Sequence, residues 1–359
     1  MKIAFDVRAI PQSGIGVYTR ILKESLPLYY DNIKVCDYTD GYSVDRKNIF
    51  NKYVNSLKRL LRDQLTINSW MKNNNVDIYH NPRNTGAPII CGGKVVVTIH
   101  DVIPHVLPQY YLNSPIERIY YELMLREAIY RSDAIITDSE FSKREIVKYY
   151  NVNPEKITTI YLDCSDNFKP LAEDVVSNVK DKFSIKRPYF LIMGGSEYRK
   201  NVRTVLATYG KYFKDNYDIV VVGGAWRNLD LSKDYGHINS IHFLKGISDE
   251  ELCALYNGAE VFIFASIYEG FGIPLLEAMN CGTPVVAANS SCLPEIAGDA
   301  ALYFEPLDCE DLKVTLNRLL TDQSLKEKMI KSGFVQAANY DWKKTVAETY
   351  EVYKKVLNQ

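Results

Sequence analysis

The chain has 359 residues, 47% apolar and 24% charged, which is enough to bury a large core and favours two domains. The formal net charge of -1 argues against a nucleic-acid partner, because proteins that follow a phosphate backbone usually carry a clear basic excess. The seven cysteines are scattered and include no C-x-x-C pair, so we expect free thiols rather than a zinc or redox site.

Short runs rich in β-branched and aromatic residues recur along the chain and predict strands buried in parallel sheets. The first half contains KIAFDV, IKVCDY, VDIYHN, KVVVTIHD and AIITDS, and the second half contains PYFLIMGG, YDIVVVGG, AEVFIFAS and TPVVAANS. Helix-length stretches lie between them, namely SPIERIYYELMLREAIYRS, KNVRTVLATYGKYF and SDEELCALYNGAE. In the last of these, Ser248 and Glu251 form a capping box, which predicts a helix start.

This alternation of strands and helices occurs twice and predicts an α/β protein with two Rossmann-like, doubly wound domains. We expect an N-terminal domain over residues 1–165 and a C-terminal domain over residues 185–341, joined by the weaker stretch between them. Ligands of such folds bind beyond the carboxyl ends of the strands. Two facing domains would therefore hold a ligand in a central cleft.

The first glycine loop is SGIGVYTR, which follows the first strand and opens the first helix. It resembles the dinucleotide fingerprint G-x-G-x-x-G, but Thr19 stands in place of the third glycine, so we do not expect NAD. Gly14 and Gly16 still allow a phosphate or sugar of another substrate to approach the backbone closely.

His100 and Asp101 lie just past a predicted strand, in TIHDVIPH. His100 and His105 lack a third clustered ligand, so a metal site is not expected here. The position at the carboxyl end of a strand favours a functional role for His100. The alternative is a ring that is simply hydrogen-bonded within the strand-end turn.

A second glycine loop, IMGGSEYRKN at residues 192–201, also follows a strand and precedes a helix. Arg199 and Lys200 stand just before that helix, where a guanidinium fork and an ammonium charge suit a diphosphate. Taken alone, such a pair would more often be solvated surface charge. No D-x-D occurs in the chain, so we expect protein cations, and no metal or cofactor, to neutralise a bound phosphate.

The third loop, YEGFGIPLLE at residues 268–277, places Glu269 and Glu277 around a glycine turn. Gly270 and Gly272 allow a tight turn, and the backbone N–H groups of the helix that follows favour an anion. We expect Glu277 in the first turn of that helix. Carboxylates can accept hydrogen bonds from sugar hydroxyls, although Glu277 could merely complement the helix dipole and Glu269 could be solvated.

Together these segments resemble glycosyltransferase family 4, retaining enzymes of GT-B fold that use nucleotide-diphosphate sugars. The resemblance runs through MGGSEYRKN and through the continuous stretch from FLKGISDEEL to ALYFEP, where Glu269 and Glu277 form the E-x7-E signature of the family. GIGVYTR, TIHDVIPHVLPQYY and DSEFSKREI are similar to the N-terminal domain of its mannosyltransferase-like members. The resemblance covers most of the chain.

The resemblance implies a role for each candidate residue. Lys200 and Arg199 would contact the donor diphosphate, Glu269 would hold hydroxyls of the transferred sugar, and Glu277 would contact the ribose. The other donor-binding residues would be Gly16, Gly270, Phe271, Gly272 and Ile273. His100 would lie against the sugar and the acceptor, with Gly14 and Asp101 on the acceptor side. Gly195 departs from the family, since many members carry a second diphosphate-binding arginine there.

The implied reaction transfers a hexosyl group, with mannosyl from GDP-mannose favoured, to a hydroxyl of a glycan or lipid-linked oligosaccharide with retention. Glu269 is a candidate covalent nucleophile, but its place at the sugar hydroxyls favours a front-face path. A UDP-hexose donor, an epimerase or phosphorylase, an NAD-dependent oxidoreductase and a non-catalytic nucleotide-sugar-binding protein are the alternatives. In the GT-B fold the last helix, here about 342–359, crosses back to the N-terminal domain.

Residues 46–62 combine Lys and Arg with apolar residues. Such a segment can be a packed helix with a solvated face or can lie on an anionic bilayer, which would suit a lipid-linked acceptor.

Asp6 and Arg8 interrupt the first apolar run, and no apolar stretch approaches ~18 residues. We therefore expect a cytoplasmic protein. If residues 46–62 contact a bilayer, it would act at the inner face of the membrane.

Overall fold

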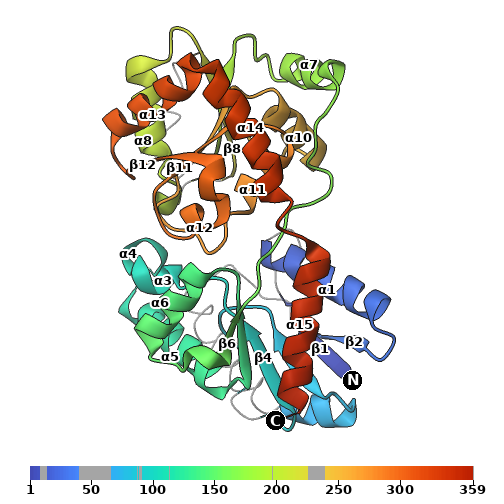
Figure 1. Cartoon of the computed structure of the whole chain (residues 1–359). Coiled ribbons are helices and arrows are strands. Elements are labelled where there is room, and N and C mark those ends of the chain that lie inside the picture. The colour runs from blue at the N-terminus through green and yellow to red at the C-terminus, as the bar shows by residue number, and fades with distance from the viewer. Residues whose placement is uncertain are drawn as a thin grey trace. The chain divides into compact units, whose positions relative to one another are not determined.

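The computed structural model describes residues 1–8, 14–39, 66–86, 88, 91–112, 114–195, 197–224 and 239–358. The chain forms two compact units, and each has its own parallel sheet (Figure 1). The first unit comprises Met1–Tyr161 and Trp342–Gln359, and the second comprises Leu162–Asp341. Residues 46–62, the predicted basic amphipathic segment, lie outside the described residues.

The sheet of the first unit has the strand order β2-β1-β3-β4-β5-β6, with all neighbours parallel. Its strands are β1 (Lys2–Asp6), β2 (Lys34–Tyr38), β3 (Ile78–Asn81), β4 (Lys94–Thr98), β5 (Ala134–Thr137) and β6 (Ile157–Thr159). The order reverses between β1 and β3, because the chain adds β2 on one side of β1 and every later strand on the other. Such a reversal is the usual place for a ligand in a doubly wound sheet.

Helices cover both faces of this sheet. They are α1 (Gly14–Tyr29), α3 (Ile103–Val106), α4 (Pro108–Tyr111), α5 (Pro115–Arg131), α6 (Glu140–Tyr150), the short 3-10 helix η1 (Pro154–Lys156) and α15 (Trp342–Leu357). Val95 and Val97 of β4 join a core with Leu125 of α5 and Ile146 of α6. Thr98 points to the other face, where its hydroxyl lies 2.9 Å from the hydroxyl of Tyr18 in α1.

Helix α15 returns from the end of the chain to the first unit. It lies beside α1 and along the sheet, as the red helix of Figure 1 shows. Its Tyr353 is fully buried, and the Tyr353 hydroxyl lies 2.6 Å from Nδ1 of His80 in β3. The other ring nitrogen of His80 lies 2.8 Å from the Thr98 hydroxyl, so this buried histidine is satisfied inside the core.

The second unit has the strand order β12-β11-β10-β7-β8-β9, again entirely parallel. Its strands are β7 (Tyr189–Met193), β8 (Asp218–Val222), β9 (Ile241–Leu244), β10 (Val261–Phe264), β11 (Val285–Ala288) and β12 (Ala301–Phe304). This is the order of the classical dinucleotide-binding fold, with the reversal between β7 and β10.

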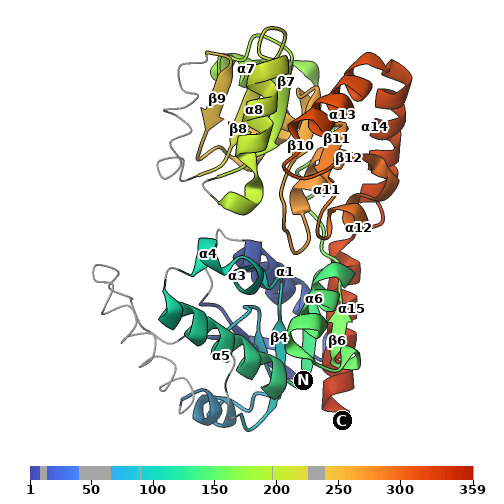
Figure 2. The same cartoon turned by 90° about the vertical axis from the view of Figure 1, so that its left-hand side faces the viewer.

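The helices of the second unit are α7 (Glu173–Lys182), α8 (Val202–Tyr212), α10 (Asp249–Asn257), α11 (Ile273–Asn280), α12 (Leu293–Ala297), α13 (Cys309–Thr321) and α14 (Gln323–Ala337), with the 3-10 turns η2 (Tyr198–Lys200) and η4 (Gly298–Ala300). Helix α8 lies beside α13, and α10 lies beside α7 (Figure 1). Helix α13 also lies beside α14 (Figure 2). The predicted capping box starts α10, because the Ser248 side chain accepts from the Glu251 N–H and the Glu251 side chain accepts from the Ser248 N–H.

The predicted α/β class with two doubly wound sheets is confirmed, and all nine predicted apolar runs form strands. Three strands were not predicted, namely β6, β9 and β12. Each lies at an edge of its sheet and is at most four residues long; Thr or His interrupts the apolar residues of β6 and β9, whereas β12 is apolar throughout and was missed. The stretch taken as a connection between the domains also contains helix α7, which belongs to the second unit.

Candidate active site

The order of strands in the second unit brings two of the predicted loops together. Strands β7 and β10 are hydrogen-bonded neighbours, with Ile192 opposite Ile263. The arginine and lysine of η2 follow β7, and Glu269 follows β10. Because the strands are parallel, both loops leave from the same edge of the sheet, at the point where the strand order reverses.

Glu269 forms ion pairs with both predicted cations. Its Oε1 lies 2.8 Å from Nζ of Lys200, and its Oε2 lies 2.5 Å from Nη1 of Arg199. The backbone also joins the two loops, since the Ile267 N–H donates to the Arg199 carbonyl at 2.7 Å. A second carboxylate, Glu197, accepts from Nε of Arg199 at 2.6 Å. The structure therefore places three of the four predicted catalytic side chains in one cluster.

The charges in this cluster keep Glu269 ionised. Burial alone would raise the pKa of this carboxyl, but the charges of Lys200 and Arg199 outweigh that effect and hold its pKa below the usual value of 4.5. The Lys200 ammonium also lies 5.5 Å from the centre of the Phe264 ring. The charges of Lys200 and Arg199 are balanced here by the carboxylates of Glu269 and Glu197, so an anionic ligand has to compete with these carboxylates for the two cations.

The glycine turn between the two glutamates has the geometry that the sequence predicted. Gly272 caps α11 with a φ of +99°, and a Cβ there would come within 3.4 Å of side chains of Leu293, Leu275 and Phe264. Phe271 is buried, and its carbonyl accepts from the Cys292 thiol at 3.0 Å. The side chain of Phe271 thus belongs to the core, and contacts of Gly270, Phe271, Gly272 and Ile273 with a donor stay predictions.

Glu277 occupies a different place from the one predicted. Helix α11 begins at Ile273, so Glu277 falls in its second turn and not in its first. The Glu277 carboxylate accepts a hydrogen bond from the Tyr256 hydroxyl at 2.9 Å. Burial raises the pKa of Glu277 to about 7, the Tyr256 hydrogen bond opposes the shift, and the charge of Asp249 adds to it. Glu277 therefore changes protonation near neutral pH.

In the first unit, an unpredicted ionic cluster marks the reversal of strand order. Asp6 ends β1, is fully buried, and lies 2.6 Å from Nη2 of Arg8 and 2.8 Å from Nη2 of Arg83. The Tyr79 hydroxyl donates to the same carboxylate at 2.9 Å. Burial opposes ionisation of Asp6, but the two guanidinium groups outweigh it and hold its pKa at about 2. Its position at a strand end, where ligands bind, was the signal that the sequence offered.

His100 is held by acceptors on both ring nitrogens. Nδ1 lies 2.6 Å from Oδ2 of Asp138, and Nε2 lies 3.1 Å from the carbonyl oxygen of Pro82. Burial alone would lower the pKa of His100, but Asp138 outweighs it and raises the pKa above 6.5. These contacts match the hydrogen-bonded strand-end turn that was the alternative to a catalytic role. Asp138 was not predicted, although it directly follows a predicted strand.

The remaining candidates of the first unit lie near the same sheet edge. The Asp101 carboxylate accepts from the Ile103 N–H at 3.0 Å and so holds the start of α3, while its carbonyl accepts from the Asn84 side chain at 2.9 Å. Helix α1 begins at Gly14, and a Cβ at Gly14 would meet no atom within 4 Å. Gly16 is buried in the first turn of that helix. Their contacts with ligands stay predictions.

The described ranges contain no cluster of three or more His, Cys, Asp or Glu side chains placed to hold a metal ion. All seven cysteines are free thiols, as predicted. Among the helices of the described residues, none combines the length and apolar character needed to span a bilayer.

Two doubly wound domains, with a cation cluster at the reversal point of the second sheet, agree with the GT-B fold that the sequence resemblance implied. Residues 14–162 match the family model described as Glycosyltransferase Family 4, and residues 177–336 match Glycosyl transferases group 1. The chain is 32% identical over 273 residues to O-antigen chain mannosyltransferase B of Escherichia coli, covering 73% of this chain and 70% of the relative. The chain therefore belongs to glycosyltransferase family 4.

Two further similarities extend this comparison. Serotype-specific mannosyltransferase WbdA of Escherichia coli is 29% identical over 74% of this chain, but the match spans only 34% of that longer protein. The structure of HepE from Anabaena in complex with UDP-glucose superposes with a TM-score of 0.77 at 15% identity, covering 99% of this chain and 100% of that one. At such low identity the second similarity shows the fold alone.

Proposed function

We propose that the protein transfers a mannosyl group from GDP-mannose to a hydroxyl of a growing glycan or lipid-linked oligosaccharide in polysaccharide biosynthesis, with retention of anomeric configuration. The observation that carries this proposal is the pairing of Lys200 and Arg199 with Glu269 at the reversal point of the second sheet. The names of the O-antigen mannosyltransferase relatives support the mannosyl group and the glycan acceptor.

The cation cluster supports binding of a diphosphate. An incoming diphosphate would compete with Glu269 for the ammonium of Lys200 and the guanidinium of Arg199, since both cations already bind an anionic oxygen at 2.8 and 2.5 Å. Glu269 would then be released toward the hydroxyls of the transferred sugar. No metal is required in this proposal, because the two side chains supply the positive charge.

The proposed chemistry is a front-face displacement. The acceptor hydroxyl oxygen forms a bond to the anomeric carbon while the bond from that carbon to the diphosphate oxygen breaks. The hydroxyl proton passes to the departing diphosphate, and Lys200 and Arg199 stabilise the charge that develops there. Glu269, released toward the hydroxyls of the transferred sugar, is better placed to orient the sugar than to attack its anomeric carbon.

A UDP-linked hexose, which the sequence left open as an alternative, is the second candidate donor. A lipid-linked acceptor would bring the enzyme to the inner face of the membrane, where residues 46–62 are the proposed contact.

The test is thermal denaturation of the full chain with GDP-mannose, UDP-glucose and ADP-glucose, followed by transfer of labelled sugar from the stabilising donor. A ligand that binds only the folded state, present at 100 times its dissociation constant, stabilises that state by about 2.7 kcal/mol. The donor with the correct nucleotide base should therefore give the largest rise in Tm. We expect GDP-mannose to give that rise. A larger rise with UDP-glucose would select the second donor, and hydrolysis or epimerisation without transfer would contradict the proposed reaction.

A further inference from the structure

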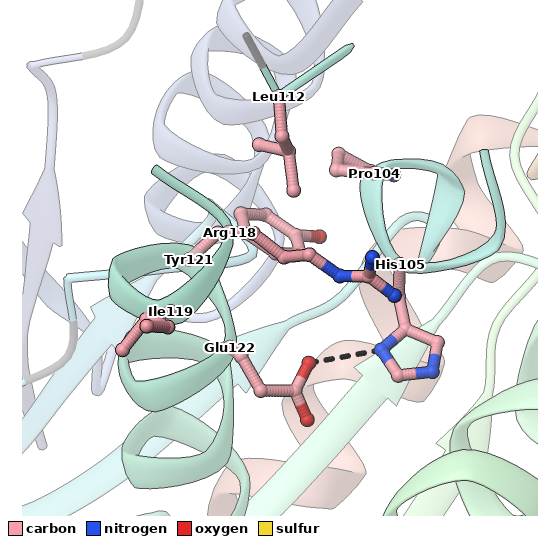
Figure 3. A pocket seen from close by; sticks show the side chains of 7 residues that line it. All are labelled: Pro104, His105, Leu112, Arg118, Ile119, Tyr121 and Glu122. Carbon is pink, nitrogen blue, oxygen red and sulfur yellow. Dashed lines mark hydrogen bonds and ion pairs between the residues drawn. The ribbon is translucent and has the colours of Figure 1, made fainter. Parts of the chain in front are cut away.

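A pocket of about 290 Å³ lies in the first unit, between α3 and the start of α5. It is lined by Pro104, His105, Leu112, Arg118, Ile119, Tyr121 and Glu122, which Figure 3 shows as sticks. This volume is at the lower end of known ligand sites and suits a group the size of one sugar residue. The proposed donor site does not use any of these residues.

Arg118 is a solvent-exposed residue that contributes a positive charge to this pocket. Further along the same helix, Arg126 and Arg131 each pair with a glutamate four residues earlier, Glu122 and Glu127. The residue four before Arg118 is the neutral Ser114, and within the part of the chain that the structure describes Arg118 has no ion-pair partner. Its side chain extends from α5 toward His105 of α3 (Figure 3).

The carboxylate nearest in sequence on this helix face, Glu122, is already occupied. It lies 2.9 Å from Nδ1 of His105 and 2.9 Å from Nε of Arg126, and it accepts from the Tyr150 hydroxyl at 3.1 Å. Burial would raise the pKa of Glu122, but these partners outweigh it and hold the pKa below its usual value. Since three donors engage this single negative charge, it does not neutralise Arg118.

Tyr121 adds a hydrogen-bond donor to the same pocket. Its hydroxyl oxygen is buried and forms no close hydrogen bond with a described residue, although an interaction with the Asn84 side chain lowers its pKa. Because this buried hydroxyl lacks a close hydrogen bond, an acceptor supplied by a ligand would stabilise it. Burial raises the pKa of Tyr121, and the negative charges of Asp101 and Glu122 add to that shift.

We propose that this pocket binds an anionic group, a carboxylate or a phosphate ester, carried by the acceptor glycan. Arg118 is the counter-ion, and Tyr121 donates the hydrogen bond. Leu112, Ile119 and Pro104 cover the apolar face of the sugar ring. The identity of the ligand as the acceptor rests on the proposed function, whereas the binding of an anionic sugar does not.

The test follows the methyl NMR signals of Leu112 and Ile119 while the full chain is titrated, without donor, with glucuronate, mannose 6-phosphate and mannose. At least one of the anionic sugars is expected to shift both signals at lower concentration than mannose, and the tighter of the two identifies the carboxylate or the phosphate. Arg118→Gln should weaken that binding at least about tenfold and leave mannose unaffected, because one charge-assisted hydrogen bond is lost. Arg131→Gln, on the same helix but outside the pocket, is the matched control.

Equal binding of mannose and the anionic sugars, or equal loss in Arg118→Gln and Arg131→Gln, would overturn the proposal. So would binding that disappears in Lys200→Ala, since the anion would then occupy the donor site. Tyr121→Phe provides a second variant, expected to weaken anion binding several-fold without a loss of Tm. An error in the proposed function would be distinguishable, because no sugar transfer would then be detected while these titrations would give the same result.

Discussion

Lys200 Nζ lies 2.8 Å from Glu269 Oε1, although 69 positions separate the two residues in the sequence. The contact exists because β7 and β10, which precede these residues, are neighbours at the reversal of strand order. It joins the proposed binder of the diphosphate to the proposed binder of the transferred sugar. Changes on either side of this pair should therefore have separable effects on transfer.

Lys200→Ala is expected to lower kcat by ~10²-fold or more, because the ammonium would stabilise charge on the departing diphosphate. Steady-state transfer of labelled sugar measures the effect. Arg203→Ala is the control, since Arg203 is an exposed cation at the start of α8, three residues further on. An unchanged kcat in Lys200→Ala would remove this residue from the mechanism.

Glu269→Gln is expected to slow transfer more than it weakens donor binding, because the proposed contact is with the transferred sugar. It should also destabilise the fold by ~1–3 kcal/mol at pH 7, since Lys200 and Arg199 lose their shared counter-ion.

The pH dependence of the free energy of unfolding tests, independently of transfer activity, whether Glu269 is ionised in the folded protein. Its folded-state pKa lies below 4.5, so the contribution to stability is present above pH 4.5 and is lost as the pH falls through the folded value. Urea denaturation at pH 7 and at pH 4 should show a smaller stability difference between these pH values for Glu269→Gln than for the wild type. Identical differences would argue against an ionised Glu269 in the folded protein.

Glu277 should make donor binding depend on pH near neutrality. Its pKa is raised to about 7, and the ionised form is the better acceptor for ribose hydroxyls, so donor affinity should increase between pH 6 and pH 8. The free energy of unfolding should change in the opposite direction, decreasing as the pH rises. Because the folded-state pKa of Glu277 is above the usual 4.5, its contribution to stability is fully present below pH 4.5 and is lost as the pH rises to about 7.

Calorimetric titration of donor at pH 6, 7 and 8 measures this effect. Glu277→Gln should bind donor more weakly and without the pH trend. Tyr256→Phe removes the hydrogen bond that opposes the shift, so it should move the midpoint above that of the wild type. A pH trend that survives in Glu277→Gln would assign it to another group.

His100 should titrate above its ordinary pKa of 6.5 because Asp138 stabilises the imidazolium. Asp138→Asn is expected to lower that pKa, as followed through the imidazole signals by NMR. The stability that the pair contributes is present below pH 6.5 and is lost as the pH rises through the folded pKa of His100.

His100→Ala separates a catalytic role from a structural one. A direct contact with the sugar and the acceptor predicts a fall in kcat at native Tm. Full transfer activity at native Tm would instead assign His100 to the strand-end turn, where both ring nitrogens already have acceptors.

The sequence by itself determined the features that depend on neighbouring residues. Apolar runs identified the central strands, because a strand covered on both faces needs an apolar residue at nearly every position. The capping box at Ser248 and the turn at Gly272 could also be predicted from the sequence, because each depends on only a few adjacent residues. The E-x7-E stretch and the glycine loops likewise identified the family.

The tertiary structure decided which of these local features meet. The order of strands, which no single run encodes, brought Glu269 to Lys200 and Asp138 to His100. Three short edge strands, β6, β9 and β12, escaped prediction because three or four residues give only a weak local pattern. The start of α11 moved Glu277 into the second turn and against Tyr256, and only the packing of α3 on α5 created the pocket at Arg118. Such contacts join residues distant in sequence, so the fold alone specifies them.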